Sequence, residues 1–361
     1  MKLISVEISE FQSIRHSNRF DVGDITCLVG KNEAGKTAIL QALYRLNPLI
    51  PQDGTYNVTD DFPRSEVEDY QQDVEAGRRK PAIIVRATFK LTEEEIASIE
   101  SEFGTGILNN PFLTLSKGYE NKLCFEISIN ETVAVKAIVD AAQLPTELAQ
   151  KFSASTNIET LKSFADTETS SENAEHIRRL QSNLQKITQK TDGLTSYIYE
   201  KYLQKLVPKF LYFDEYFLMK GHENIESLKS RVQSNNLQQP DYPLLGLIEL
   251  ARLKLDELLN PQRTEWLVNK LEGASNHLSN KILKYWSQNK HLLMRFDVRP
   301  GRPGDPKEMT SGTNIWARIY DSKRMVTTPL GTRSRGFVWF FSFLAWFDQQ
   351  QRKNELLILL S

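Results

Sequence analysis

The stretch GKNEAGKT, residues 30 to 37, decides the fold. It fits the spacing G-x-x-x-x-G-K-[ST], follows the apolar run at residues 25–29 and precedes the helically spaced Ile39, Leu40, Leu43 and Leu46. This order predicts a strand buried on both faces, then a glycine-rich loop, then a helix. In such a loop, backbone N–H groups and the positive end of the helix dipole face the phosphates of a nucleotide. The stretch therefore predicts a nucleotide-binding site.

The residues of the loop have expected roles. Lys36 would contact the β- and γ-phosphates, and Thr37 would ligate Mg²⁺. The expected cofactors are ATP and Mg²⁺, with Thr37 as the metal-binding residue. The expected phosphate-binding residues are Gly30, Lys31, Asn32, Glu33, Ala34, Gly35, Lys36 and Thr37.

Composition fits a folded protein, with 40% hydrophobic and 25% charged residues in a chain of 361. The formal charge is -1, so any contact with nucleic acid must come from a local patch. The N-terminus lacks an apolar signal core, and the apolar stretch at residues 336–347 is too short to span a bilayer. We therefore expect a cytoplasmic protein with no membrane partner.

Other candidate sites are weaker. Cys27 and Cys124 lie in apolar, strand-like runs and are expected to be buried core thiols. The five histidines are scattered without metal-ligand spacing. Two short basic clusters, at residues 78–80 and 299–302, are each either a solvated loop or a DNA contact.

Three regions follow along the chain. Residues 1–91 are expected to form an N-terminal ATPase lobe that contains the glycine-rich loop. The alternating runs at residues 81–91 and 122–129 are expected to be antiparallel strands of one lobe. Residues 92–206 are expected to be a mainly helical insertion with additional strands, including a helix with Ile177, Leu180, Leu184 and Ile187 on one stripe. Residues 207–361 are expected to form a second lobe, with a hairpin at residues 296–320 split by a glycine and proline loop.

A family resemblance extends this interpretation. The strand ending ISEFQSI at residues 8–14, followed by LVGKNEAGKTAILQAL, resembles the N-terminal half of RecF/SMC-like ABC ATPases and most resembles the OLD (overcoming lysogenization defect) family. The stretches DDFPR at residues 60–64, PKFLYFDEY at 208–216 and LEGAS at 271–275 are similar too. The resemblance implies an α/β fold, an ABC/SMC-type P-loop ATPase head with an antiparallel β lobe and a helical lobe.

The resemblance also implies further site residues. The family commonly has an arginine directly after the phenylalanine, where this chain has Gln12, so a base or ribose contact is carried over to the nearby Arg15. Ser334, Arg335 and Gly336 resemble the signature motif, which approaches ATP held by the opposite head; the alternative is a plain buried aromatic helix.

The catalytic carboxylates expected of this family are not assigned to any residue. The pair Asp214 and Glu215 ends an apolar strand, but it precedes the signature motif, whereas a Walker B strand should follow it. The apolar run at residues 356–360 is in the expected place, yet no Asp-Glu pair comes after it. We therefore expect the Walker B carboxylates and the TOPRIM nuclease module to lie in a longer chain or in a partner chain.

The expected function is that of an ATP-binding and hydrolysing head of an OLD-like endonuclease. Nucleotide-dependent pairing of heads, as a homodimer or higher homo-oligomer, would control DNA cleavage in antiviral (antiphage) defence. One alternative is a nucleotide-gated scaffold ATPase that controls a separate nuclease or toxin effector. Another is a RecF/SMC-like DNA repair ATPase.

Overall fold

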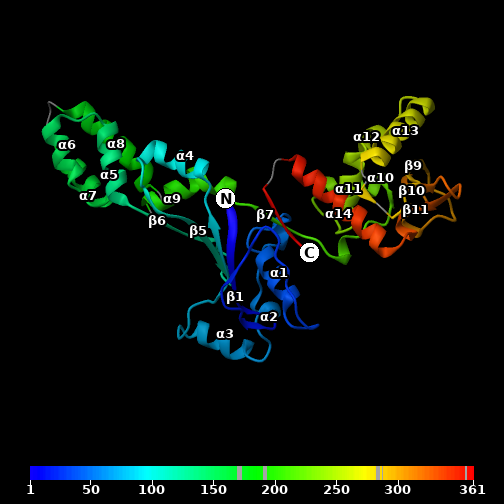
Figure 1. Cartoon of the computed structure of the whole chain (residues 1–361), viewed down its shortest axis with the longest axis horizontal. Coiled ribbons are helices and arrows are strands. Elements are labelled where there is room, and N and C mark those ends of the chain that lie inside the picture. The colour runs from blue at the N-terminus through cyan, green and yellow to red at the C-terminus, as the bar shows by residue number, and fades with distance from the viewer. Residues whose placement is uncertain (169–172, 190–192, 282–284, 287, 354–355) are drawn as a thin grey trace. The chain divides into compact units, whose positions relative to one another are not determined.

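The computed structural model describes residues 1–168, 173–189, 193–281, 285–286, 288–353 and 356–361. These residues form two compact units, one of Met1–Tyr212 with Leu360 and one of Phe213–Leu359 with Ser361. Both units combine helices with antiparallel strands (Figure 1). The chain is therefore a mixed α/β protein.

An antiparallel sheet forms the centre of the first unit. Its strands follow the order β2-β1-β4-β5-β6, with β3 beside β1. Their bounds are β1 Lys2–Phe11, β2 Ile14–His16, β3 Phe20–Asp21, β4 Ile83–Lys90, β5 Leu108–Gly118 and β6 Cys124–Ile129. The predicted antiparallel strands at residues 81–91 and 122–129 are thus confirmed as β4 and β6, which share one sheet with β5 between them.

Alternation of side chains explains which face of this sheet is buried. Val6, Ile8 and Phe11 of β1 are buried, as are Ala87 and Phe89 of β4. A register shift between Leu3 and Ser5 of β1 places Leu3 opposite Phe89, so Leu3 is buried on this face as well. Burial of each large apolar side chain contributes about 1.5–3 kcal/mol, so β1 and β4 hold the core of this unit together.

Helices complete the first unit. They are α1 Lys36–Tyr44, α2 Val58–Asp61, α3 Val67–Glu75, α4 Glu93–Phe103, α5 Glu131–Ala141, α6 Thr146–Ser153, α7 Ile158–Thr167, α8 Ala174–Thr188 and α9 Gly193–Ile198, which continues into a π-helical turn at Tyr199–Leu203. Helix α1 packs against β1 and against β7 Lys209–Tyr212. The predicted apolar stripe of α8 is confirmed, because Ile177, Leu180, Leu184 and Ile187 are all buried.

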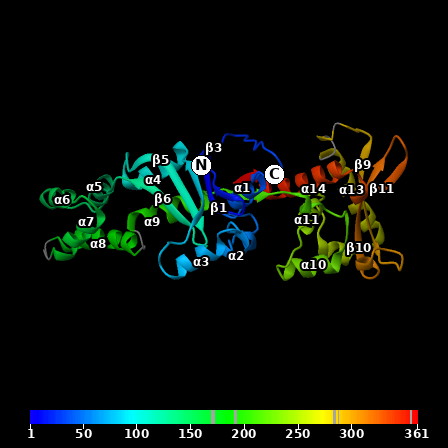
Figure 2. The ribbon, with the colours of Figure 1, turned by 90° about the horizontal axis from the view of Figure 1, so that it is seen from below.

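The second unit places helices against a second antiparallel sheet (Figure 2). Its strands are β8 His222–Asn224, β9 Leu292–Pro300, β10 Thr313–Asp321 and β11 Val326–Pro329, with β10 at the centre. The helices are α10 Ile225–Gln233, α11 Asp241–Leu250, α12 Leu255–Leu259, α13 Thr264–Lys281 and α14 Arg335–Arg352. The predicted hairpin at residues 296–320 is confirmed by the pairing of β9 with β10.

Two contacts fix the helices of the second unit. Helix α13 accepts hydrogen bonds from the outer edge of β9, since Ser279 Oγ accepts from Met294 N at 2.8 Å and Ser275 Oγ accepts from Phe296 N at 3.1 Å. Helix α11 approaches α14 so closely that a Cβ at Gly246 would lie 2.5 Å from the Ala345 carbonyl oxygen. The predicted strand after α14 is also present, as β12 Leu357–Leu360.

The prediction of a buried strand at residues 25–29 is wrong. The chain leaves the sheet after Val22, whose N–H still bonds to Ile4 O at 2.8 Å. Ile25 and Val29 are then 94% and 91% exposed, and no described strand pairs with this segment. A continuous apolar run forms a buried strand only where neighbouring strands and layers cover it, and the described residues supply neither.

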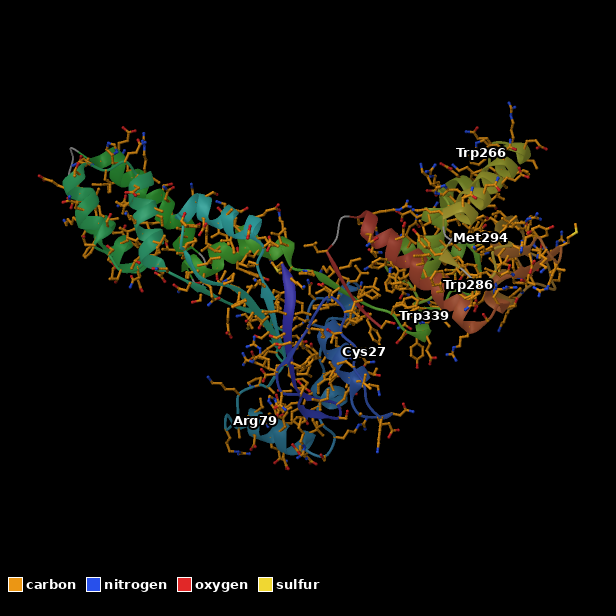
Figure 3. All side chains as sticks on the ribbon, in the orientation of Figure 1. Cys27, Arg79, Trp266, Trp286, Met294 and Trp339 are labelled. Carbon is orange, nitrogen blue, oxygen red and sulfur yellow. The ribbon has the colours of Figure 1, made fainter. Side chains whose placement is uncertain are left out.

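The prediction of buried thiols is wrong for both cysteines. Cys27 lies in the same exposed segment (Figure 3). Cys124 begins β6, where alternation turns it to the open face while Phe125 faces inward. An apolar run in the sequence therefore does not show which residues of a strand face the core and which face solvent. Among the described helices, none is both long enough and apolar enough to cross a membrane.

Candidate functional site

The glycine-rich loop enters α1 through a backbone conformation that glycine favours. Gly35 immediately precedes the helix and has a φ of 86°. A Cβ at this position would lie 3.3 Å from both Ile14 Cγ1 and Ser13 Oγ. Both the left-handed backbone and the close approach of the β1–β2 turn therefore require the second glycine of the motif.

The side chain of Lys36 folds back over the loop. Its Nζ donates to the carbonyl oxygens of Gly30 at 2.9 Å and Lys31 at 2.7 Å. Within the loop, Glu33 has a φ of 65° and Ala34 N donates to Lys31 O at 3.3 Å. The ammonium group thus lies against the rim of a tight turn, where it neutralises carbonyl dipoles and supplies a positive charge beside the start of α1.

Backbone donors at the start of α1 have no protein acceptor. Within the described part of the chain, the N–H groups of Gly35, Lys36 and Thr37 donate no hydrogen bond, and no side chain caps the helix. The first N–H groups of a helix carry its positive dipole end and have no partner inside the helix. Three unpaired donors beside an ammonium group fit the phosphates of a nucleotide.

The expected metal ligand is placed next to these donors. Thr37 is the second residue of α1 and is exposed. No group of three or more His, Cys, Asp or Glu side chains gathers anywhere in the described ranges. A single hydroxyl suits Mg²⁺, which binds through few protein ligands and completes its shell with waters and substrate phosphates.

A buried ion pair anchors the other end of α1. Arg45, directly after the helix, places Nη1 2.6 Å from Asp61 Oδ2, and Asn57 N donates to the same oxygen at 2.8 Å. The side chain of Asp61 is 6% exposed and that of Arg45 is 25% exposed. The guanidinium also lies over the Phe11 ring, 5.4 Å from its centroid. The DDFPR stretch is therefore a structural anchor for the helix that follows the loop.

Lys117 of β5 contacts the same end of α1, and no sequence motif had pointed to this residue. Lys117 Nζ donates to Arg45 O at 3.1 Å and to Gly54 O. Burial lowers the pKa of this ammonium group. Tyr56 adds a further contact, because its hydroxyl donates to Ala42 O at 2.6 Å. Carbonyl groups at the C-terminus of α1 thus receive donors, as helix ends require.

Arg15, which was expected to contact the base or ribose of the nucleotide, pairs with a carboxylate of the protein. Arg15 forms an ion pair with Glu66, and its side chain is 74% exposed. Gln12 instead contacts α1, because its Nε2 donates to Gln41 Oε1 at 3.2 Å. Ser13, which sequence reasoning missed, lies beside Gly35. Gln12, Ser13 and Ile14 therefore lie against α1 or its cap.

The signature-like residues stand at an exposed helix start in the second unit. Ser334 is the N-cap of α14, without a side-chain cap hydrogen bond, and Gly336 would place a Cβ with nothing within 4 Å. Arg335 forms an ion pair with Glu215. The inner face of the helix is fixed by Phe337 and Phe341, which are buried. The first turn of α14 is thus open to a ligand, while its apolar face holds it in place.

Asp214 and Glu215 have structural contacts within the second unit. The Asp214 carboxylate accepts from Tyr216 N at 2.9 Å and caps the short 3₁₀ turn Glu215–Phe217. Glu215 pairs with Arg335. These contacts account for both carboxylates without a metal.

Comparison with known proteins agrees with the geometry of the loop. Among curated proteins, no sequence matches this chain. The sequence model of the family described as AAA ATPase domain matches residues 1–308, which include the glycine-rich loop and most of both units. The chain therefore belongs to the AAA ATPase domain family.

Proposed function

We propose that the loop at residues 30–37 binds ATP with Mg²⁺ and that the chain hydrolyses ATP as one head of a pair. The observation that carries this proposal is the combination at Lys36: an ammonium group, a left-handed glycine and three unpaired N–H donors at one helix start. ATP would supply the phosphate anhydride that is cleaved. Gly35, Lys36 and Thr37 would hold its phosphates, and Thr37 Oγ1 would ligate Mg²⁺.

A second copy of the chain would complete the site. The loop belongs to the first unit, whereas Ser334, Arg335 and Gly336 begin a helix of the second unit. We propose that this helix start contacts the γ-phosphate of ATP bound by the partner, so that a symmetric pair closes two sites at once. The open space at Gly336 supports this role, because a phosphate can approach the backbone there.

The experiment that tests the pairing uses Gly336→Arg. The new side chain would fill the open approach to α14, so it should block ATP-dependent dimerisation and turnover while ATP binding by the monomer stays unchanged. Light scattering with and without ATP, together with nucleotide titration, measures both effects. Gly273→Arg is a matched control, because Gly273 also has open space around it but lies within α13. Normal dimerisation and hydrolysis by Gly336→Arg would refute pairing through this helix.

The resemblance to the OLD family supports a finer proposal. In it, ATP-dependent pairing of heads controls cleavage of DNA by a TOPRIM nuclease, in defence against phage. This proposal stands on the quoted sequence motifs. Nuclease assays on the complete protein, with and without ATP, would test it, and cleavage that is indifferent to ATP would contradict the coupling. A nucleotide-gated scaffold would instead show ATP-dependent assembly with no cleavage by the protein itself.

A further inference from the structure

Positive charge is concentrated in one part of the second unit. Residues 290–335 contain ten lysines and arginines and four acidic residues, a formal charge of +6, although the whole chain carries -1. This segment includes β9, β10 and β11. The basic cluster at residues 78–80 differs, because Arg78 pairs with Asp73 and Arg79 pairs with Glu10. Three of these cations, Arg295, Arg299 and Arg318, lie on strands of the second sheet, and the other seven lie in the segments beside those strands.

Strand register gathers three arginines on the open face of that sheet. In β10, Ile315, Ala317 and Ile319 face the core. The alternate positions face outward, and the register places Arg318 directly opposite Arg295 of β9. Arg299 lies four residues further along β9, about 13 Å away by strand geometry.

Aromatic rings beneath these arginines hold the guanidinium groups in place. Arg295 lies 4.0 Å from the centroid of the Tyr320 ring. Arg299 and Arg318 lie 5.1 Å and 5.2 Å from the centroid of the Trp316 ring. Such stacking reduces the freedom of each side chain while leaving N–H donors for an anion. We call Arg295, Arg299, Arg318, Tyr320 and Trp316 the arginine face.

The carboxylates near the arginine face do not balance the charge of its three guanidinium groups. Asp297 is the carboxylate within it, 3.8 Å from Arg299 and 3.9 Å from Arg318, and Arg299 also pairs with Asp305 at 3.1 Å. The connecting loop, residues 301–312, contains two cations and two carboxylates, so it does not change the balance. Burial and the charge of Lys220 lower the pKa of the adjacent His222, which keeps it neutral at pH 7. The three guanidinium groups and the carboxylates of Asp297 and Asp305 therefore leave a net charge of +1 on the arginine face.

Two further features of the arginine face indicate an absent partner. Arg295 and Arg318 are like charges directly opposite each other, a pairing that destabilises an antiparallel ladder. In addition, Arg299 Nε and Trp316 Nε1 are buried donors without an acceptor among the described residues, and Trp316 is 7% exposed. An anion along the face would relieve the repulsion and could accept from guanidinium groups.

We infer that the arginine face binds the phosphate backbone of double-stranded DNA. Proteins that bind single strands stack bases on open aromatic rings, whereas here Trp316 is buried beneath arginines. Arg295 and Arg299 lie about 13 Å apart along β9, so the arginine face is long enough to contact more than one phosphate of a backbone. The choice of DNA over duplex RNA rests on the proposed function, whereas the phosphate contact does not.

The test is fluorescence anisotropy of a labelled DNA duplex with the nucleotide-free full chain at about 50 mM salt. Arg295→Gln with Arg318→Gln should weaken binding about tenfold or more and reduce the slope of log affinity against log salt by about 2, since each phosphate contact contributes about 0.9. Arg178→Gln with Arg179→Gln is the matched control, because it removes two exposed arginines from α8 of the first unit. Circular dichroism establishes that both double variants are folded.

Several results would overturn DNA binding by the arginine face. Unchanged affinity in the Arg295 and Arg318 double variant, or an equal loss in the control, overturns it. Tighter binding to single-stranded DNA, or to vesicles that contain phosphatidylserine, overturns it too. Duplex RNA that binds as tightly as duplex DNA overturns the choice of DNA. Lys36→Ala should bind the duplex normally although it loses ATP affinity. The ATP-binding proposal and the DNA-binding inference can therefore fail independently of each other.

Discussion

Two helix starts in this protein are open to anions, and they are built differently. At α1, a left-handed Gly35 and the folded-back Lys36 form a turn around three unpaired N–H groups. At α14, Ser334 has an extended backbone with a φ of -55° and a ψ of 144°, and the adjacent cation, Arg335, pairs with Glu215. The N-terminus of α1 offers a loop of backbone donors and the charge of Lys36, whereas the N-terminus of α14 offers little more than its helix dipole. We infer that α1 binds phosphate by itself and that α14 contributes only to an anion already held.

The largest difference between the two helix starts should appear when a side chain is added to each glycine. Gly35→Val should abolish measurable ATP binding, because valine is strained at a φ of 86° and its Cβ would crowd Ile14 and Ser13. Gly336→Ala should leave ATP binding and folding unchanged, because nothing lies within 4 Å of its Cβ. Calorimetric titration of ATP into each folded variant measures the contrast. Normal binding by Gly35→Val would show that the loop does not need its left-handed glycine.

The start of α1 also depends on the anchor at its far end. Asp61→Ala should lower the free energy of unfolding by about 2–4 kcal/mol, because Arg45 loses its carboxylate and Asn57 N loses an acceptor. Urea unfolding measures this loss. Asp60→Ala is the neighbouring control, since Asp60 is exposed and should change stability by less than about 0.5 kcal/mol. Equal stability of the two variants would remove the anchoring role of Asp61.

The smallest effect is expected at the ion pair beside α14. Glu215→Gln should change folding stability by less than about 1 kcal/mol, because the side chains of Glu215 and Arg335 are 57% and 72% exposed. It should nevertheless strengthen ATP-dependent dimerisation a few-fold, since one negative charge near the incoming phosphates is removed. Light scattering across an ATP titration measures the shift. Weaker dimerisation would mean that Glu215 helps to position Arg335 for contact.

Helices and strands were predicted correctly where the residues with an apolar pattern are also packed against other parts of the chain. The apolar stripe of α8 and the helix after Gly35 follow from local periodicity, and the β9–β10 hairpin follows from the glycine and proline loop that divides it. Residues 25–29 have the same kind of apolar signal as a buried strand, but their burial depends on neighbours that local pattern does not contain. Cys27 was misplaced with them for the same reason.

The residues of the candidate site also fall into those that the sequence identified and those that it did not. Spacing identified Gly35, Lys36 and Thr37, because the conformation of a phosphate-binding loop is encoded within eight residues. Spacing did not identify Lys117, which comes to α1 through the pairing of β5 with β4. It did not identify Ser13 either, which lies in the turn between β1 and β2. The arginine face likewise appears only in the register of β9 with β10.

The most direct test of the central claim compares ATP binding by Lys36→Ala and Arg335→Ala under conditions where both are monomeric. Lys36→Ala removes the cation of the cradle and should weaken ATP binding by about 30-fold or more, as expected for a hydrogen bond to a charged group worth about 2–3 kcal/mol. Arg335→Ala should bind ATP as the unaltered chain does, because α14 would act only across a pair. Unchanged affinity in Lys36→Ala, or an equal loss in both variants, would contradict the assignment of the loop at residues 30–37 as the ATP site.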